Sequence, residues 1–108
     1  MPTVRACSTS DVSPGSMKYV RAGGKDLLIA NVEGKFYAVD NWCTHEQGNL
    51  SHGELKKNVV TCPDHGSQFD VLTGLVLGGP DGESADSIPP AKSYKITVQG
   101  NDLMVDIP

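Results

Sequence analysis

Residues 43–70, CTHEQGNLSHGELKKNVVTCPDHGSQFD, hold two of the three cysteines and all three histidines of this 108-residue chain. They contain a Cys-x-His pair, Cys43 and His45, and a Cys-x-x-His pair, Cys62 and His65, with sixteen residues between the pairs. Cysteine and histidine are the side chains that bind zinc, copper and iron–sulfur centres. Glycine and proline beside the two pairs indicate turns. The stretch therefore predicts one metal site built from two loops.

Two kinds of metal centre are candidates. A structural zinc site accepts two cysteines and two histidines, but its paired ligands are usually two to five residues apart. Only one residue separates Cys43 from His45, so the two side chains bind a single tetrahedral ion with difficulty. They bind two different metal atoms more easily. A [2Fe–2S] cluster with mixed ligation has that arrangement, because both cysteines bind one iron and both histidines bind the other. Two such similar pairs disfavour the third interpretation, buried thiols and histidines without a metal.

Outside this stretch the chain has the pattern of β-strands joined by tight turns, with no convincing helical periodicity. Glu33-Gly34 and Gly100-Asn101 are typical two-residue hairpin turns between such strands. The predicted strands cover residues 17–21, 26–32, 35–39, 59–61, 67–70, 92–99 and 102–107. Turns at short intervals along an all-β chain predict an antiparallel β sandwich or barrel.

A chain of this length is one ordinary domain, here residues 1–108. The terminal hairpins lie far apart in sequence, and residues between them are rich in glycine and potential ligands. We therefore expect an outer β frame, residues 1–41 and 81–108, with a small metal-binding subdomain inserted at about residues 42–80.

Composition narrows the class of protein. The formal net charge of −4 and the pI near 5.1 disfavour a nucleic-acid binder, which is usually basic. No apolar run follows the N-terminus, so no signal peptide or membrane span is expected. The odd cysteine count favours a reducing compartment. Together these features predict a cytoplasmic protein.

The two ligand motifs resemble those of the Rieske family, which are C-x-H and C-x-x-H, the latter followed by a pair such as Gly-Ser. In this chain they read CTH at 43–45 and CPDHGS at 62–67. The LGGP at 77–80 is similar to that family's proline loop, and residues 94–107 are similar to its closing hairpin. The resemblance spans most of the chain.

The resemblance implies an antiparallel β sandwich with a small cluster-binding subdomain and one Rieske-type [2Fe–2S] cluster. It implies that Cys43 and Cys62 bind the inner iron, and that His45 and His65 bind the outer iron near solvent. It also implies that the Ser67 hydroxyl lies near a cluster sulfur and that Pro80 belongs to the loop covering the cluster.

Departures from the family pattern bear on the reduction potential. High-potential members have a disulfide between the ligand loops, and its two positions are Gly48 and Asp64 in this chain. They also have a tyrosine whose place is taken by Phe69. Loss of a hydrogen bond to sulfur lowers the potential, because such a bond stabilises the electron-rich reduced cluster. We expect a potential in the lower part of the Rieske range.

The chain is too short to hold an oxygenase domain, so it resembles the small Rieske ferredoxins. That resemblance implies an electron carrier rather than an enzyme, a monomer that passes one electron from a flavin-dependent reductase to a terminal oxygenase. Two alternatives remain open, a Rieske-like small subunit of a larger enzyme such as nitrite reductase, and a zinc-stabilised interaction domain.

Several other residues have simpler expected roles. Trp42 is expected to pack beneath the first ligand loop, Cys7 to be a free thiol near the first strand, and His52 to be an ordinary loop residue. Glu46 is considered for a docking surface. The acidic loop with Asp81, Glu83 and Asp86 is expected to be a solvated connector, and contact with a basic reductase is the alternative.

Overall fold

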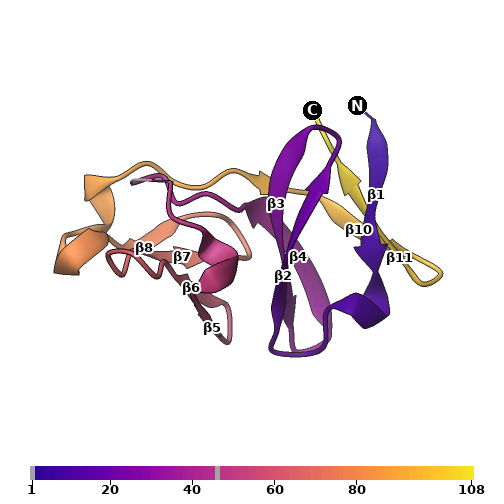
Figure 1. Cartoon of the computed structure of the whole chain (residues 1–108), viewed down its shortest axis with the longest axis horizontal. Helices are drawn as coiled ribbons and strands as arrows, with labels where there is room; N and C mark the ends of the chain where they lie inside the picture. Colours follow the sequence, from indigo (N-terminus) through magenta and orange to yellow (C-terminus); the bar gives the residue numbers. More distant parts are fainter. Residues whose placement is uncertain (1, 46) are drawn as a thin grey trace.

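The regular structure of the chain is built from β-strands, as the sequence predicts (Figure 1). The computed structural model describes residues 2–45 and 47–108, and within those ranges no α-helix occurs. The strands are β1 (Thr3–Ser8), β2 (Met17–Ala22), β3 (Lys25–Val32), β4 (Lys35–Asp40), β5 (Glu54–Lys56), β6 (Val59–Thr61), β7 (Gln68–Asp70), β8 (Val76–Gly78), β9 (Ser93–Tyr94), β10 (Ile96–Gln99) and β11 (Asp102–Asp106). Short 3-10 turns are η1 (Thr9–Asp11), η2 (Leu50–His52), η3 (Pro80–Gly82) and η4 (Ala85–Ser87).

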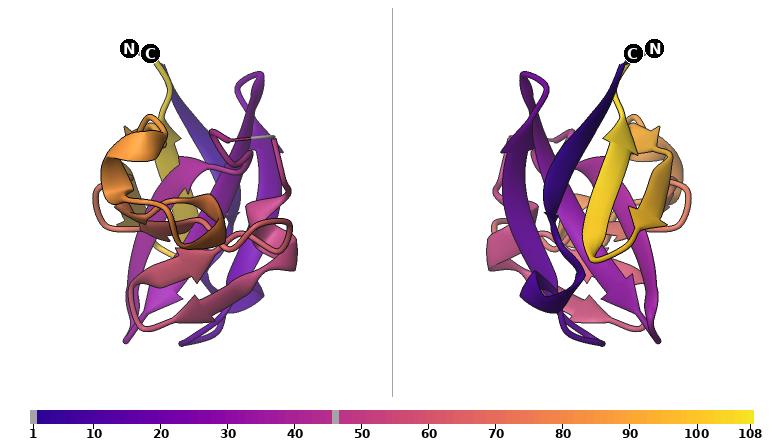
Figure 2. Two further views of the ribbon diagram at one scale, coloured as in Figure 1. Left: turned by 90° about the vertical axis from the view of Figure 1, so that its left-hand side faces the viewer. Right: turned by 90° about the vertical axis from the view of Figure 1, so that its right-hand side faces the viewer.

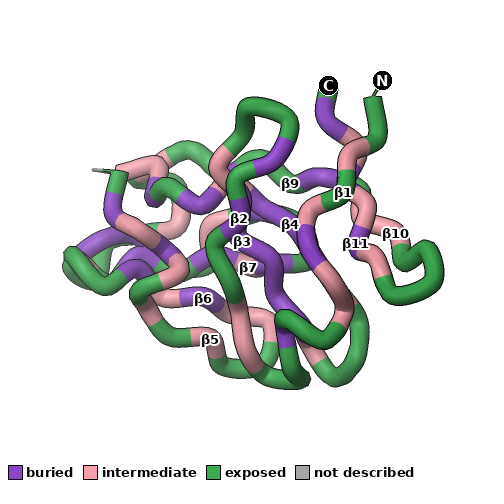
Figure 3. Tube along the Cα trace, turned by 45° about the vertical axis from the view of Figure 1, so that its right-hand side comes forward, coloured by how far each residue is buried: buried purple, intermediate pink, exposed green. Residues whose placement is uncertain are grey.

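The described strands form three antiparallel sheets, in the orders β1–β11–β10, β2–β3–β4–β9 and β5–β6–β7–β8. The predicted all-β antiparallel fold is thus confirmed. The second sheet is the middle layer, because successive side chains of β3 enter different cores. Leu27 and Ile29 pack in the core shared with the first sheet, while Leu28 and Ala30 pack in the core shared with the third. This explains the buried, continuously apolar centre of β3 (Figure 3).

Both predicted hairpin turns are present. Glu33 and Gly34 have φ values of 54° and 91°, the left-handed conformation that a two-residue turn with the right twist requires. The second turn, Gly100-Asn101, joins β10 to β11 in a register that pairs Gln99 with Asp102. These turns fix the register of the hairpins that frame the molecule.

The predicted strand over residues 92–99 is wrong as a single strand. The chain divides it at Lys95: β9 pairs with β4 in the second sheet, and β10 pairs with β11 in the first. The alternating pattern runs through the division, because both halves bury residues in the same core, Tyr94 fully and Ile96 partly. Alternation of apolar and polar residues indicates which face of a strand is buried. It does not indicate which neighbouring strand provides the hydrogen bonds.

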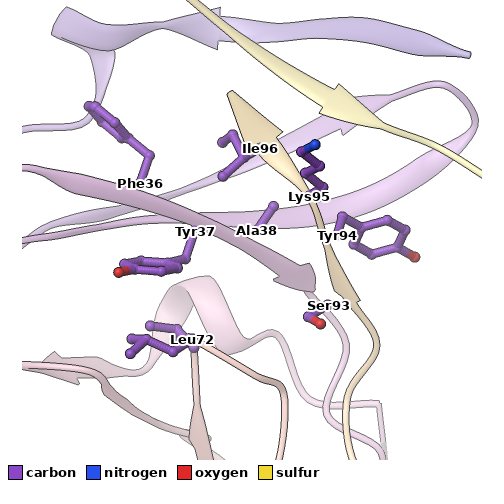
Figure 4. A pocket seen from close by; sticks show the side chains of 9 residues that line it. Phe36, Tyr37, Ala38, Leu72, Ser93, Tyr94, Lys95 and Ile96 are labelled. Carbon is purple, nitrogen blue, oxygen red and sulfur yellow. The ribbon is translucent and has the colours of Figure 1, made fainter. Parts of the chain in front are cut away.

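A hollow of about 320 Å³ opens where the chain changes sheets. Figure 4 shows Tyr37 of β4 and Leu72 near one another, with Ser93 and Ile96 on the segment that makes the change. Its described lining contains no cysteine or histidine, so we do not assign this hollow to the metal site.

The third sheet occupies residues 54–78, and the segment with η3 and η4 lies at the same end of the molecule (Figure 2, left). The chain returns to the middle sheet at β9. The expected division into a frame of 1–41 and 81–108 around an insert of about 42–80 stays a prediction. Among the described residues there is no helix long and apolar enough to cross a membrane.

Candidate metal centre

The two predicted ligand loops close on themselves through the same hydrogen bonds. In each, the cysteine N–H donates to the carbonyl five residues later, and the cysteine carbonyl accepts from the N–H four residues later. These distances are 2.8 and 2.9 Å around Cys43, and 2.8 and 3.1 Å around Cys62. The fourth residue is left-handed in both loops, with φ of 57° at Gln47 and 79° at Gly66. Two segments of unlike sequence therefore present their cysteines from equivalent turns.

The cysteines point inward and lie together. Cys43 and Cys62 are only 2% and 3% exposed, both are free thiols, and they share the second core with Leu50, Val60 and Phe69. Burial is the main cause that raises the pKa of the Cys62 thiol, and a side-chain hydrogen bond with Cys43 raises it further. Two adjacent buried thiols can act as thiolate ligands to one metal atom.

Backbone groups of the second loop are directed at the Cys62 sulfur. Hydrogen bonds from the backbone at Asp64 and His65 act to lower the pKa of this thiol, against the effect of burial. Donors in this position stabilise negative charge on sulfur. These bonds oppose the effect of burial, but the pKa of the Cys62 thiol remains raised on balance.

The predicted histidine ligands lie further out than the cysteines. His45 and His65 are both half-buried, and their ring centroids are 5.2 Å apart with the planes at 75°. Asp81 stands beside the second of them: its N–H donates to the His65 carbonyl at 2.7 Å, and its carboxylate lies 3.6 Å from Nδ1 of that ring. The histidines therefore form a second pair, nearer to solvent than the thiols.

Gly48 lies where the two loops approach each other. A methyl group on its Cα would be 2.7 Å from the Cys62 sulfur and 2.7 Å from a carboxylate oxygen of Asp64. Such distances are too short for non-bonded atoms, so this position requires glycine. The two positions that hold a disulfide in high-potential Rieske proteins, Gly48 and Asp64, are thus neighbours here and have no cross-link.

The remaining predicted site residues are Ser67 and Pro80, and both are buried. Among the described residues, Ser67 Oγ is the buried side-chain polar atom that has no hydrogen-bond partner. A buried hydroxyl without a partner is costly, which points to a group that it meets when the centre is filled. Pro80 begins η3, in the segment that bonds to the second loop through Asp81.

These features fit a [2Fe–2S] cluster of mixed ligation. The thiols form one pair and the imidazoles another, as a cluster with two sulfur-bound and two nitrogen-bound positions needs. The buried Ser67 hydroxyl and the backbone groups beside Cys62 are donors that could bond to the sulfur atoms of such a cluster. A single tetrahedral ion binds its four ligands at one point, so it does not account for a buried thiol pair and a separate imidazole pair nearer to solvent.

The structure also reveals a polar cluster that the sequence did not suggest. The Asp26 carboxylate accepts hydrogen bonds from the Tyr19 hydroxyl (2.5 Å), Arg21 Nη1 (2.8 Å) and the Trp42 indole N–H (3.0 Å). The Asp26 carbonyl also accepts from the N–H of Asn41 at 3.0 Å. Through these hydrogen bonds the β2–β3 hairpin holds Asn41 and Trp42, the two residues before the predicted ligand Cys43, in place.

Trp42 corrects one expectation. It does not pack beneath the loop but lies 40% exposed, with its ring against that of Tyr19 at a centroid distance of 6.4 Å. Its N–H finds a surface carboxylate on a neighbouring hairpin, a contact between residues 16 positions apart. No local sequence signal marks such a pairing.

The charge state of this cluster sets a testable pH dependence. Hydrogen bonds from Trp42, then Tyr19 and Arg21, lower the pKa of Asp26 from 3.8 to about 2. A depressed carboxyl pKa stabilises the folded protein above the ordinary pKa, and this contribution is lost as pH falls from about 4 towards about 2.

We therefore expect Asp26→Asn to lower the urea midpoint of unfolding at pH 7, because the amide is a weaker acceptor than the carboxylate. The difference from the unmodified protein should shrink as pH falls below about 4. Fluorescence of Trp42, the chain's one tryptophan, reports the unfolding. Asp102→Asn is the matched control, since Asp102 also pairs with an arginine, Arg5, at 2.9 Å. Equal effects of the two substitutions would refute the special role of Asp26.

The other singled-out residues lie outside the candidate centre. Cys7 is a buried free thiol in β1, as expected. His52 ends η2, where its Nε2 is 3.5 Å from the Asn49 amide. Glu46 lies outside the described residues.

Comparison with known proteins identifies the family. The Rieske [2Fe-2S] domain matches residues 3–95. The chain is 34% identical over 104 residues to the ferredoxin component of the naphthalene 1,2-dioxygenase system of Pseudomonas putida, covering 96% of this chain and 94% of that protein. It is 37% identical over 107 residues to the biphenyl dioxygenase ferredoxin subunit of Pseudomonas sp. (strain KKS102), covering 98% and 93%.

Solved structures agree. The Sphingomonas yanoikuyae B1 ferredoxin has a TM-score of 0.85 and 28% identity, with 99% of this chain and 100% of that chain covered. A chain in the complex of reduced oxygenase and oxidized ferredoxin in carbazole 1,9a-dioxygenase has a TM-score of 0.81 and 32% identity, covering 95% and 91%. The chain therefore belongs to the Rieske [2Fe–2S] domain family. Its cofactor is one Rieske-type [2Fe–2S] cluster, which removes the zinc alternative.

Proposed function

We propose that this chain is a Rieske ferredoxin that carries one electron from a flavin-dependent reductase to a terminal oxygenase. The observation that carries the proposal is the pair of equivalent loops, which place two buried thiols together and two imidazoles further out. The chain is an electron carrier and has no catalytic role of its own.

In this proposal Cys43 and Cys62 bind one iron, and His45 and His65 bind the other. When bound, the cluster supplies a one-electron couple whose potential is higher than that of an all-cysteine cluster, because neutral imidazoles replace two thiolates. The chain's own residues exclude water from the thiol side and leave the histidine side closer to solvent. Electrons then have a short path to a partner at the histidine edge.

The assignment of partners is supported by the relatives. Those compared above are named as ferredoxin components of naphthalene and biphenyl dioxygenase systems. One similar chain is part of a complex between an oxygenase and a ferredoxin. We extend this to a flavin-dependent reductase as electron donor, to a cytoplasmic location, and to a monomer, which suits a carrier that must visit two partners in turn.

The proposal is tested by reductive titration followed by electron paramagnetic resonance at two pH values near neutrality. A Rieske-type signal that appears near about −150 mV with little pH dependence supports an oxygenase-system ferredoxin of low potential. A potential well above zero would contradict that role and favour a respiratory type of partner. Turnover of an aromatic substrate, reconstituted with a reductase and an oxygenase, should then depend on this chain.

Ser67→Ala is expected to lower the reduction potential by on the order of 50 mV. One hydrogen bond contributes about 1 kcal/mol, and a tenfold change in a one-electron equilibrium corresponds to about 59 mV. The shift is measured by the same titration, with Ser93→Ala as control, because Ser93 is exposed and lies in the hollow of Figure 4. An unchanged potential would mean that the Ser67 hydroxyl does not reach the cluster.

A further inference from the structure

A second hollow, of about 270 Å³, lies between β8 and η4. The backbone of these two elements lies at the same end of the molecule as the rest of the third sheet (Figure 2, left). The side chains that line it are apolar except for that of Asp86, and backbone polar atoms form much of the remaining lining surface. The lining residues are Leu75, Val76, Ala85, Asp86, Ile88 and Pro90. Leu75 is 57% exposed and nearby Leu77 is 49% exposed, so apolar surface continues out of the hollow along β8. Exposed apolar surface of this kind is typical of an interaction site.

The segment of sequence that forms this hollow carries acidic side chains and no lysine or arginine up to Lys92, two residues beyond Pro90. Residues 58–91 contain no lysine or arginine, so all nine basic side chains of the protein lie elsewhere in the sequence. The same segment contains five acidic residues, and three of them, Asp81, Glu83 and Asp86, stand exposed beside the hollow or in the turn before it. Like charges gathered around a low-dielectric surface focus a negative potential that attracts cations.

The hollow is also joined to the proposed electron exit. β8 leads directly into Gly79 and Pro80, and the next residue, Asp81, bonds to the His65 carbonyl at 2.7 Å. The Gly79 N–H donates to the Glu83 carbonyl at 2.9 Å, which closes the turn that η4 follows. A partner seated in the hollow would therefore stand beside the loop that holds His65.

We propose that this hollow receives an arginine or lysine side chain from the protein that exchanges electrons with this chain. The aliphatic stem of such a side chain matches the apolar lining, and its cation meets Asp86 and the neighbouring acidic groups. An acidic side chain would be repelled, and a purely apolar one would leave Asp86 unpaired. This inference rests on the proposed electron-carrier function and specifies the partner's docking chemistry.

The test compares two double variants of equal charge in the cluster-loaded protein. Glu83→Gln with Asp86→Asn removes two charges at the hollow, and Asp81 is kept because it touches His65. Glu33→Gln with Asp102→Asn removes two charges from the β3–β4 turn and from the first residue of β11. Each reduced protein is mixed in a stopped-flow instrument with cytochrome c, a lysine-rich acceptor, and separately with anionic ferricyanide. Reduction potentials are measured in parallel to exclude a change of driving force.

The hollow variant should reduce cytochrome c about threefold or more slowly at low ionic strength, with a weaker salt dependence, while the control variant changes little. Its reduction of ferricyanide should not slow. Ala85→Phe, which fills the hollow without altering charge, should also slow the reaction with cytochrome c.

Equal rates for the two double variants would overturn the docking proposal and leave electron transport intact. A wild-type protein that loads its cluster but reduces neither acceptor would contradict the carrier function itself, and the docking proposal with it.

Discussion

Gly48→Ala will yield protein that does not retain its [2Fe–2S] cluster. The added methyl would lie 2.7 Å from the Cys62 sulfur and equally close to the Asp64 carboxylate. The exposed carboxylate can turn away, but the Cys62 sulfur is buried in the core and has no free space to move into. Either the first loop withdraws or the thiol leaves its position, and each separates Cys62 from Cys43. The visible absorption of the purified protein and its content of iron and acid-labile sulfide measure the loss.

Gly78→Ala is the matched control for this substitution. Neither glycine has a left-handed φ, and a methyl on Gly78 would meet only the Gln68 side-chain oxygen, at an ordinary 3.6 Å. The control should keep its cluster and its unfolding midpoint. A fully loaded Gly48→Ala protein would show that the two loops are not held as closely as described.

His65→Cys is expected to lower the reduction potential of whatever cluster is retained, by on the order of 100 mV or more. A thiolate in place of a neutral imidazole adds one negative charge to the unit, which makes a further electron harder to accept. All-cysteine clusters of the plant type lie near about −400 mV, and a single exchange should move the potential part of that way. Redox titration with spectroscopic detection gives the value, and the resonance spectrum should lose its Rieske character.

The third histidine provides the control. His52→Cys places a thiol at an exposed position at the end of η2, outside the two ligand loops, and should leave both the potential and the spectrum unchanged. If His65→Cys kept the potential and the signal of the unmodified protein, the assignment of His65 as a ligand would be wrong.

Much of the fold was predictable because its signals are local. The Glu33-Gly34 and Gly100-Asn101 turns depend on residues that accept left-handed backbone, and both form as expected. Alternation along residues 102–107 placed Leu103, Val105 and Ile107 on one face, and all three are buried, whereas Val98 of the preceding strand is 54% exposed. The division of one predicted strand at Lys95 was not predictable, because strand pairing depends on neighbours that are distant in sequence.

The candidate site shows the same division. Short Cys and His motifs are dense local signals, so the two pairs and their shared loop chemistry could be read directly from the sequence. The need for glycine at position 48 arises because the two loops approach each other closely. The hydrogen bond from Trp42 to Asp26 forms because the β2–β3 hairpin packs beside the first loop. Neither has a local pattern, and Trp42 was consequently expected in the wrong place.

The order of strands in the first sheet also constrains the sequence of events in which the protein can fold. Its central strand, β11, pairs on one side with β1, whose residues are synthesised about a hundred positions earlier. The third sheet, in contrast, joins only neighbours in the chain, within residues 54–78. Pairing between neighbours in the chain can form earlier than pairing between distant segments, so the third sheet can fold before β11 meets β1. Until β11 is in place, the apolar side chains of β3 that share a core with it, Leu27 and Ile29, stay exposed.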